Sequence, residues 1–481
     1  MKTRSTSEGW VVSKAWTIML AFSFGLASCS LPDTRLWKKR TGVTPVSMPT
    51  EVIPKVILHG TIKSMVSNPV SCTSKGISMA WNRSHLLTGG IFKQRDLLQS
   101  AYTRGTGIEE ALDLKGLPAP LPGKVDCLVD GREFFPALYR SIGNAQRRID
   151  TQVYIFDNDD VATQLADRLK ERSQDVQCRV LMDRLGSIAS WWSAPDSSCR
   201  KGFKPPSSMP HYLRRDSEVK ARFSQTPWLV TDHTKLFIFD GKEAYLGGMN
   251  IGREYRYDWH DLMVRVRGPV TTELQNIFDR SWRQQGPWGD WSMPFYRKVK
   301  PDTASADAGH YPIRLLRTTT VRAEIEEALL VAIRMSRKRI YLQNSYVTSE
   351  AILRELLAAR DRGVEVNFIF PKTNDSKLMD AASRVFATTL LKHNCNVYLY
   401  PKFSHVKASI IDNWACVGSA NLDGLSLRIN GELNIAYSDP EAVETLRQKV
   451  FLKDIQASQK LKRGDLEDST TFLITLLIQQ L

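Results

Sequence analysis

A short pattern occurs twice in this chain, and the fold has to accommodate both copies. The first copy is HTKLFIFDGKEAYLGGMN, from His233 to Asn250, and the second is HVKASIIDNWACVGSAN, from His405 to Asn421. In each copy a His and a Lys stand two positions apart within a run of apolar and aromatic residues. Residues spaced this way on a β-strand point to the same face. Each copy therefore predicts an imidazole and an ammonium group that project together.

Both copies fit the pattern HxKxxxxD. A single His on a strand usually has a structural role, but its repetition together with a Lys favours catalysis. Two lysines on strands with buried character also require an anionic partner. The two Asp residues stand at the strand ends, where we expect them to brace the fold rather than touch a substrate. The candidate catalytic set comprises His233, Lys235, Asp240, His405, Lys407 and Asp412.

The repeat continues beyond the strand. After each motif Gly, an Asn follows three positions later and an acid fourteen positions later. The acid is Asp261 in the first copy and Glu432 in the second. A carboxylate that accepts a hydrogen bond from Nδ1 of a histidine leaves Nε2 facing the substrate. We therefore predict that Asp261 and Glu432 orient the two histidines.

Helical and strand-like segments alternate around both copies. In the first half, FFPALYRSIGNAQRR has helical spacing and IDTQVYIF is strand-like; in the second half, AEIEEALLVAIRMSRKR and IYLQNSYV follow the same order. Gln152 and Gln343 even fall at the same offset, three residues after Ile149 and Ile340. The alternation is typical of α/β structure with a largely buried sheet.

Composition and patterning divide the chain into six parts. They are a lipoprotein-type signal peptide (1–28), a tether (29–107), a first lobe (108–297), a linker (298–312), a second lobe (313–460) and a C-terminal tail (461–481). The tether is rich in Ser, Thr, Pro and Gly and has little periodicity. The first lobe has an additional segment, Ser190 to Pro210, which would be a lid beside the site or a plain surface loop.

These residues resemble the paired HKD signatures of the phospholipase D superfamily. Within it, GGMNIGREY and WHDLMVRVRGPV resemble bacterial cardiolipin synthases and related phosphatidyltransferases, and the likeness covers roughly residues 124–455. The resemblance implies an α/β fold of two similar α/β/α sandwich lobes with mixed, mostly parallel sheets. The lobes would be related by a pseudo-twofold axis, with one active site between them.

The resemblance also implies a phosphohistidine intermediate, without a metal or another cofactor. By analogy His233 would attack phosphorus and His405 would act as acid and base, while Lys235 and Lys407 neutralise the phosphodiester. The first motif has Gly248 where the second has Ser419, the residue that the family uses more often. The candidate substrate-binding residues are Asn250, Ser419 and Asn421.

The predicted function is phosphatidyl transfer from a phospholipid to an alcohol, as in cardiolipin synthesis from phosphatidylglycerol. Hydrolysis to phosphatidic acid, with water as acceptor, stays open, as do nucleic acid cleavage by a nuclease of the same superfamily and a non-enzymatic membrane-binding module. The net charge of +15 suits phospholipid headgroups or nucleic acid equally well. A membrane location disfavours nucleic acid. The sequence gives no indication of an oligomeric state.

The N-terminus predicts export. Lys2, Arg4 and Lys14 precede an apolar run from Ala15 to Ala27, which is too short for a comfortable membrane span. The run ends in Leu-Ala-Ser-Cys, which resembles a lipobox and predicts lipidation at Cys29; an uncleaved apolar anchor is the alternative. We expect a membrane-anchored bacterial lipoprotein on the periplasmic side, with the outer membrane favoured over the inner because Ser30 follows the Cys.

Three further features leave alternatives open. The remaining cysteines contain no CxxC pair, and Cys178 and Cys199 are the first pair to test for a disulfide. Trp259 and His260, next to Asp261, would line a headgroup pocket or pack in the interior. The apolar C-terminal stretch from Thr470 to Leu481 would pack on a lobe or enter a membrane surface.

Overall fold

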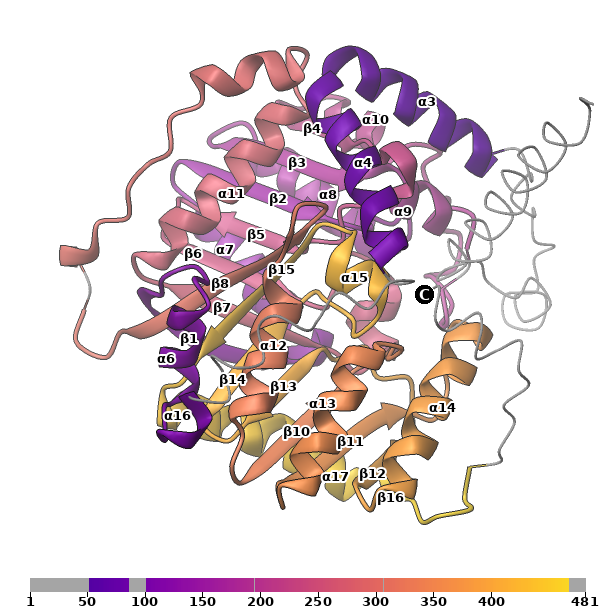
Figure 1. Cartoon of the computed structure of the whole chain (residues 1–481). Helices are drawn as coiled ribbons and strands as arrows, with labels where there is room; N and C mark the ends of the chain where they lie inside the picture. Colours follow the sequence, from indigo (N-terminus) through magenta and orange to yellow (C-terminus); the bar gives the residue numbers. More distant parts are fainter. Residues whose placement is uncertain (1–51, 86–100, 194, 306, 467–481) are drawn as a thin grey trace, which may run out of the picture.

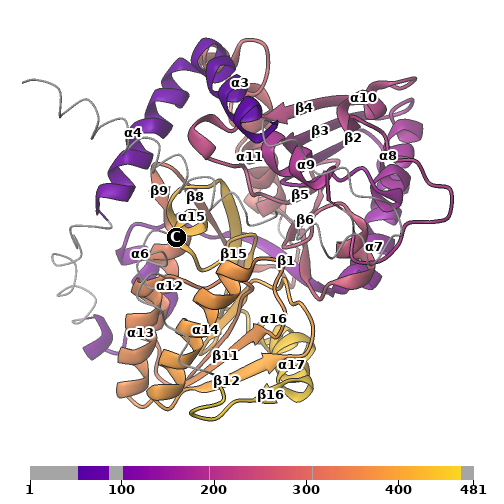
Figure 2. The ribbon, with the colours of Figure 1, turned by 90° about the vertical axis from the view of Figure 1, so that its right-hand side faces the viewer.

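The computed structural model describes residues 52–85, 101–193, 195–305 and 307–466. The predicted signal peptide, Cys29 and the apolar C-terminal stretch lie outside the described residues. Figure 1 shows two α/β halves joined along one edge. In Figure 2 the first half lies above the second half. Within the described ranges, no helix has both the length and the apolar character that a membrane crossing requires.

The first half alternates strands and helices as predicted. Its strands are β1 (Leu121–Val129), β2 (Arg148–Val153), β3 (Gln177–Asp183), β4 (Lys220–Ser224), β5 (Leu236–Phe239), β6 (Glu243–Gly247) and β7 (Leu262–Arg267). Its helices are α7 (Asp130–Asn144), α8 (Asp160–Arg172), α9 (Arg184–Ser190), α10 (Met209–Arg214) and α11 (Val270–Gln284). Short turns of helix occur at η2 (Pro227–Leu229), η3 (Glu254–Asp258), η4 (Gly289–Phe295) and η5 (Thr303–Ser305).

The second half repeats this order. Its strands are β8 (Tyr311–Thr319), β9 (Arg322–Ala323), β10 (Arg339–Gln343), β11 (Glu365–Pro371), β12 (Asn396–Tyr400), β13 (Ala408–Ile411), β14 (Trp414–Gly418), β15 (Glu432–Tyr437) and β16 (Gln459–Lys460). Its helices are α12 (Glu324–Met335), α13 (Glu350–Asp361), α14 (Lys377–Lys392), α15 (Gly424–Arg428), α16 (Pro440–Leu446), η6 (Arg447–Leu452) and α17 (Lys453–Ala457).

The two halves form one sheet with matching strand orders. The first half runs β1-β7-β6-β5-β2-β3-β4 from the junction outward, and the second runs β8-β15-β14-β13-β10-β11-β12-β16. The halves meet where β1 pairs antiparallel with β8, through Leu121 to Gly123. Each strand of the first half thus has a counterpart in the second at the same distance from the junction, and the second half adds β9 and β16. The predicted pair of similar α/β lobes is confirmed.

The sheet contains fewer parallel neighbours than predicted. Parallel pairing is confined to β2-β3-β4 and β10-β11-β12, and the other neighbours are antiparallel. The reason is local: only the outer strands of each half are linked by crossover helices, whereas each motif strand turns back as a hairpin, β5–β6 and β13–β14. The motif strands β5 and β13 lie in the middle of their halves and are buried throughout.

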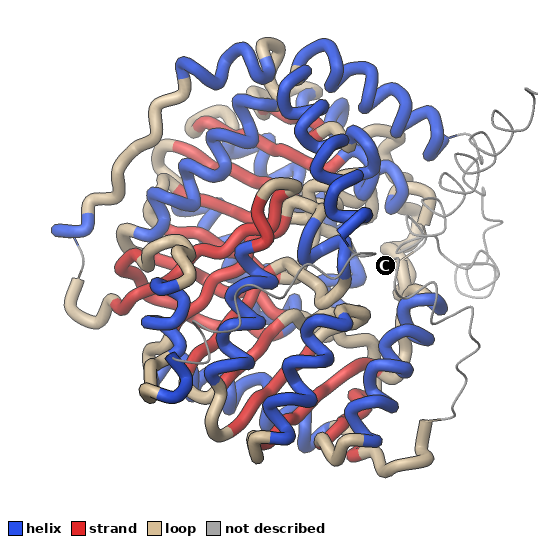
Figure 3. Tube along the Cα trace, in the orientation of Figure 1, coloured by secondary structure: helices blue, strands red, loops and turns tan. Residues whose placement is uncertain are grey.

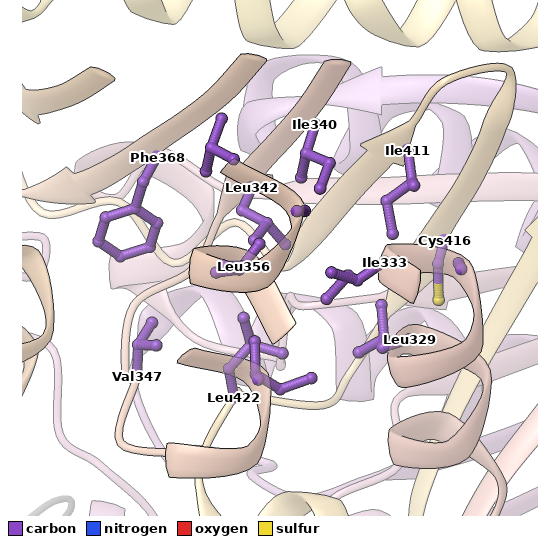
Figure 4. Packing of buried hydrophobic residues seen from close by; sticks show 14 of the residues in the cluster. Leu329, Ile333, Ile340, Leu342, Val347, Leu356, Phe368, Ile411, Cys416 and Leu422 are labelled. Atoms are coloured by element: carbon purple, nitrogen blue, oxygen red, sulfur yellow. The ribbon is translucent and has the colours of Figure 1, made fainter. Parts of the chain in front are cut away.

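Helices cover both faces of the sheet (Figure 3). One cluster of buried side chains fills the space between the second half of the sheet and α12 and α13, and it includes Leu329, Ile333, Ile340, Leu342 and Leu356 (Figure 4). A second cluster takes residues from both halves, among them Val125, Leu246, Ile313, Val417 and Ile435. Because the two halves share this core, they position the site as one body.

Side-chain caps set the starts of equivalent helices. Asp159 accepts hydrogen bonds from the first turn of α8, and Ser349 does the same for α13, which follows the equivalent strand. Such caps satisfy backbone N–H groups that have no partner within the helix. The capping residues place α8 and α13 directly after β2 and β10, as the repeated sequence pattern predicts.

The segment predicted as a tether contains two packed helices. α3 (Val52–Ser67) and α4 (Pro69–His85) lie against the first half, mainly against η2 and α9. A third short helix, α6 (Ile108–Leu114), lies in the range predicted for the first lobe but packs on α12 of the second half. It is held there by ion pairs from buried Arg314 to Glu109 and Asp113.

The Cys178–Cys199 disulfide does not form. Cys178 lies in β3 within the first-half core, whereas Cys199 is in the partly exposed loop before α10, and both are free thiols. Burial raises the pKa of Cys178 to about 12, which keeps this thiol protonated.

The Asp residues of the two motifs brace the lobes and do not reach the site. Asp240 accepts hydrogen bonds from the backbone N–H groups of Gln146, Arg147 and Arg148. Asp412 does the same for the N–H groups of residues 337–339. Both Asp residues have positive φ, 54° and 53°, in the hairpin turn after the motif strand. The contacts support the bracing role, so Asp240 and Asp412 do not belong among the catalytic residues.

This bracing predicts a pH-dependent loss of stability. Asp240→Ala should lower the free energy of unfolding by about 2 kcal/mol at neutral pH, because three backbone N–H groups lose their acceptor. These bonds, acting against the effect of burial, lower the pKa of Asp240. A lowered carboxyl pKa stabilises the fold above the pKa of the unfolded state, and the effect disappears as pH falls through the folded-state pKa. Denaturant unfolding of wild type and variant should therefore converge in acid. Full stability with lost activity would instead assign Asp240 to catalysis.

Candidate active site

Two backbone contacts between the halves assemble the site. The N–H of His233 donates to the carbonyl of Gly431 over 2.8 Å, and the N–H of His405 donates to the carbonyl of His260 over 2.7 Å. The residue after each carbonyl is a predicted orienting acid, Glu432 or Asp261. Each histidine is therefore held beside the acid that belongs to the other half.

The two histidine–carboxylate pairs cross between the halves. Nδ1 of His233 lies 2.9 Å from Oε1 of Glu432, and Nδ1 of His405 lies 2.7 Å from Oδ2 of Asp261. Both acids are fully buried, and the two histidines are nearly so. A carboxylate at Nδ1 holds the proton there and leaves Nε2 as the reactive nitrogen. The roles predicted for Asp261 and Glu432 thus have the required geometry, with partners exchanged between the motif copies.

Both lysines enter the same buried space. Nζ of Lys235 donates to the carbonyl of His233 over 2.7 Å, and Nζ of Lys407 donates to that of His405 over 2.8 Å. In addition Lys235 faces the ring of Tyr154, whereas Lys407 contacts the hydroxyl of Ser345. Each ammonium group keeps N–H donors beyond these contacts, so the pair can bind a phosphoryl group.

The predicted substrate-binding residues have three different environments. The side chain of Asn250 is engaged at both ends, because Oδ1 accepts from the N–H of Ile155 and Nδ2 donates to Tyr255. The hydroxyl of Ser419 donates to Glu432 over 2.5 Å, so it supports the acid that orients His233. In the described part of the chain, Oδ1 of Asn421 is buried and has no hydrogen-bond partner. Of the three side chains, Asn421 is the one with an unpaired oxygen among the described residues.

The difference between Gly248 and Ser419 follows from the lengths of the two acids. A Cβ atom built at Gly248 would overlap Oδ1 of Asp261. Glu432 is one carbon longer than Asp261 and leaves room for the side chain of Ser419, which it contacts. Gly with Asp and Ser with Glu are therefore two solutions to the same packing problem.

This packing predicts opposite sensitivities at the two positions. Gly248→Ser should lower kcat by about 100-fold, because displacement of Asp261 removes the orientation of His405. Ser419→Gly should cost only a few-fold, since Glu432 loses one donor but keeps its contact with His233. Steady-state rates of the two variants test this comparison. Equal effects would contradict the steric explanation.

Several residues of the site were not predicted from the sequence. Tyr154 stands edge-on to His233, with ring centroids 4.8 Å apart, and Tyr255 contacts His405. Trp259, one of the two residues considered for a headgroup pocket, also lies against His405. The repeated glutamines hold the residues just before the histidines: Gln152 donates to Asp232 and Gln343 donates to Ser404. Their shared offset in the two halves was the available signal.

His260 has a structural role between the halves. Its Nδ1 lies 2.6 Å from Asp130 and its Nε2 lies 2.8 Å from Asp454, and its ring stacks on Tyr400. Hydrogen bonds to both carboxylates outweigh burial and raise the pKa of His260 to about 10, so it is an imidazolium at neutral pH. The charged ring fixes the loop that carries Asp261. Of the two earlier alternatives for His260, packing is the one that the contacts support.

Burial and charge together set the protonation of the site. Burial, followed by the two lysines, lowers the pKa of His233 and of His405 well below the usual histidine range. Burial raises the pKa of Asp261 and of Glu432 to about 7. Burial also lowers the pKa of Lys235 to about 7 and that of Lys407 to about 8. These shifts favour neutral imidazoles and weakly held ammonium protons, and a negative charge between the lysines would reverse both effects.

The additional loop of the first half lies beside the site. Ser197 bonds to Asp258 and Arg253, and Asp196 accepts a hydrogen bond from the indole of Trp259. These contacts attach the Ser190–Pro210 segment to the turn that precedes Asp261. No group of three or more His, Cys, Asp or Glu side chains is placed to hold a metal ion within the ranges that the structure describes.

Two similar lobes that bring one His–Lys pair each to a shared buried site define a phospholipase D-like enzyme. The family model described as cardiolipin synthase, PLD-like domain, matches residues 138–282 and 329–454. The chain is 30% identical over 347 residues to the probable cardiolipin synthase YwiE of Bacillus subtilis, covering 70% of this chain and 67% of that protein. It is 29% identical over 349 residues to cardiolipin synthase A of Pseudomonas syringae, covering 68% of each. The chain belongs to the cardiolipin synthase family with PLD-like domains.

Solved structures show the same fold. A phosphatidylserine synthase from Haemophilus influenzae superimposes with a TM-score of 0.57 at 14% sequence identity. The match covers 78% of this chain and 96% of the synthase. The likeness extends over both lobes and confirms the predicted fold class.

Proposed function

We propose that this protein transfers a phosphatidyl group from one phospholipid to an alcohol, as in cardiolipin formation from two molecules of phosphatidylglycerol. The observation that carries the proposal is the crossed pair of histidine–carboxylate contacts around two buried lysines. Such a site can place Nε2 of both histidines beside one phosphoryl group, where one nitrogen attacks and the other transfers protons. Its relatives named as cardiolipin synthases support a lipid substrate.

In the first step, Nε2 of His233 attacks phosphorus, and the bond from phosphorus to the headgroup oxygen breaks. His405 protonates the departing glycerol alkoxide, which leaves a phosphatidyl group on His233. The phosphodiester brings a negative charge between Lys235 and Lys407. That charge raises the proton affinity of the nearby His405, so substrate binding itself prepares the acid. The lysines also stabilise charge on the phosphoryl oxygens in the transition state.

In the second step, His405 accepts the proton of the acceptor hydroxyl, whose oxygen attacks phosphorus. The bond from phosphorus to His233 breaks, which releases cardiolipin when the acceptor is a second phosphatidylglycerol. Two inversions give net retention of configuration at phosphorus. Burial of both histidines restricts access of water, which favours transfer over hydrolysis.

Product analysis tests the proposal. Purified enzyme would be incubated with labelled phosphatidylglycerol, alone or with added glycerol or phosphatidylethanolamine. Cardiolipin with release of glycerol is the expected result. Phosphatidic acid as the sole product would identify a hydrolase instead, and plasmid cleavage without any lipid product would identify a nuclease.

The lysine pKa values predict a pH profile for substrate capture. kcat/KM reports the free enzyme, in which Lys235 has a pKa of about 7 and Lys407 of about 8. Loss of either ammonium charge weakens phosphate binding, so kcat/KM should begin to fall above about pH 7, where Lys235 loses its proton, and fall further above about pH 8. kcat should persist to higher pH, because bound phosphate retains the lysine protons. A kcat/KM value that stays constant to pH 10 would contradict this assignment.

We further propose that Cys29 carries a lipid anchor on the periplasmic side, preferably at the outer membrane. The support is the Leu-Ala-Ser-Cys sequence after an apolar run. Metabolic labelling with a palmitate analogue should mark the wild type but not Cys29→Ala. Equal labelling of both would remove this proposal.

A further inference from the structure

Helix α3 presents its large apolar side chains outward. Leu58, Ile62, Met65 and Val66 are 61%, 54%, 49% and 76% exposed, and their spacing places them along one side of the helix. We call these four residues the α3 ridge. The buried side of the helix carries Ile53 and Val56 near its start, which pack against Leu185, and then only the smaller residues Gly60, Thr61 and Ser64. A helix that serves only to cover a core has the reverse arrangement.

The charged residues of α3 and α4 have one sign. Lys55 and Lys63 lie on α3 itself, and the sequence from Val52 to Arg95 contains no Asp or Glu. An apolar strip with basic residues on the same helix, and no acid on α3 or α4, matches the chemistry of an anionic lipid surface. Contact with a second copy of the same surface would bring basic groups toward basic groups.

Exposed aromatic residues adjoin the end of α3. Trp288, Trp291 and Phe295 lie in and beside η4 and are largely exposed. η4 contacts both α3 and α4, and Ser71 at the start of α4 bonds to Asp290 of η4. Tryptophan is favoured at the boundary between lipid and water, because its ring is apolar and its N–H is polar.

The inner side of the α3–α4 pair is attached to the segment that leads to His233. The indole N–H of Trp228 donates to the carbonyl of Cys72 over 3.0 Å, and the ring lies against Gly76. Trp228 belongs to η2, which ends shortly before His233 and strand β5. Figures 1 and 2 show α3 and α4 on the outside of the first half, and α3 contacts α9.

We propose that the α3 ridge, with Trp288, Trp291 and Phe295, is a docking surface for an anionic phospholipid bilayer. The inference rests on the proposed lipid function and adds the surface through which the site reaches its substrate. Docking on this face sets the orientation of the enzyme on the membrane, and the η2 contact connects that face to the His233 segment.

Photocrosslinking would locate the surface on the full-length protein. The enzyme is bound to vesicles of phosphatidylglycerol and phosphatidylethanolamine that contain a diazirine on an acyl chain, and adducts are mapped by mass spectrometry. Peptides from α3 and η4 should carry at least about fivefold more adduct than those with Leu114 and Val321. These two residues are the internal reference because they are apolar and similarly exposed, at 49% and 66%. Adducts on α3 at the reference level would overturn the proposal.

Paired variants connect docking to turnover. The triple variant Leu58→Ser, Ile62→Ser, Val66→Ser should lose about tenfold or more of its activity on vesicles. It should retain its activity on a water-soluble, short-chain phosphatidylglycerol below its micelle concentration. The double variant Leu114→Ser, Val321→Ser is the matched control and should resemble the wild type in both assays.

The outcomes separate docking from catalysis. Unchanged vesicle activity in the triple variant would overturn the docking surface. A wild-type dimer that the triple variant converts to a monomer, with no lipid adducts on α3, would assign the surface to a second copy instead. If the wild type fails to turn over short-chain phosphatidylglycerol but α3 still carries the adducts, the proposed function fails while the docking surface stands.

Discussion

His233→Ala should lower the rate of lipid turnover by about 10⁴-fold or more, the largest effect that we expect from any single substitution. The reason is that Nε2 of His233 forms the covalent bond to phosphorus, and no neighbouring side chain can take its place. Steady-state formation of cardiolipin measures the loss directly.

His211→Ala provides the control for this variant. His211 lies on α10 at the surface, away from the site, and its replacement should leave turnover unchanged. Substantial activity in His233→Ala, with cardiolipin still formed, would show that another group attacks phosphorus.

The crossed carboxylates predict that Glu432→Gln and Asp261→Asn block different steps. Each should reduce overall turnover by about 10³-fold, as loss of an orienting carboxylate does elsewhere. A phosphodiester with a p-nitrophenyl leaving group separates them, because that group departs without protonation. Asp261→Asn impairs His405 and should retain a burst of nitrophenolate. Glu432→Gln impairs His233 and should lose the burst.

The reverse pattern would indicate pairing within each half, Asp261 with His233 and Glu432 with His405. His405→Ala is the matched control, since it should retain the burst as Asp261→Asn does. Equal bursts in all three variants would show that neither carboxylate supports the nucleophile.

The duplicated motif was sufficient to predict the two halves and most of their elements. Its strand period and the repeated offsets of Gln152 and Gln343 depend only on residues that are close in the sequence. A single sequence is therefore enough to detect them. The crossing of Asp261 to His405 was not predictable in the same way. It depends on the backbone hydrogen bond from His405 to His260, which lie far apart in the sequence, and sequence spacing contains no information on such contacts.

It was easier to predict which residues lie in the site than to predict what each residue does there. Asn250 and Asn421 occupy equivalent positions, yet Tyr255 engages only Asn250 and leaves the two amides in different states. The helices of the predicted tether were missed for a different reason. α3 places apolar residues on its exposed side as well as on its buried side, so its pattern lacks the single apolar stripe of a core helix.

The central claim is that both halves build one site through which a phosphatidyl group passes while bound to a histidine. The most direct measurement is mass spectrometry of His405→Ala after reaction with the p-nitrophenyl phosphodiester and rapid quenching at neutral or alkaline pH. We predict an adduct of one phosphoryl ester on the peptide that contains His233, and none when His233 is also replaced by alanine. An adduct on any other residue, or a burst of nitrophenolate without an adduct, would contradict this mechanism.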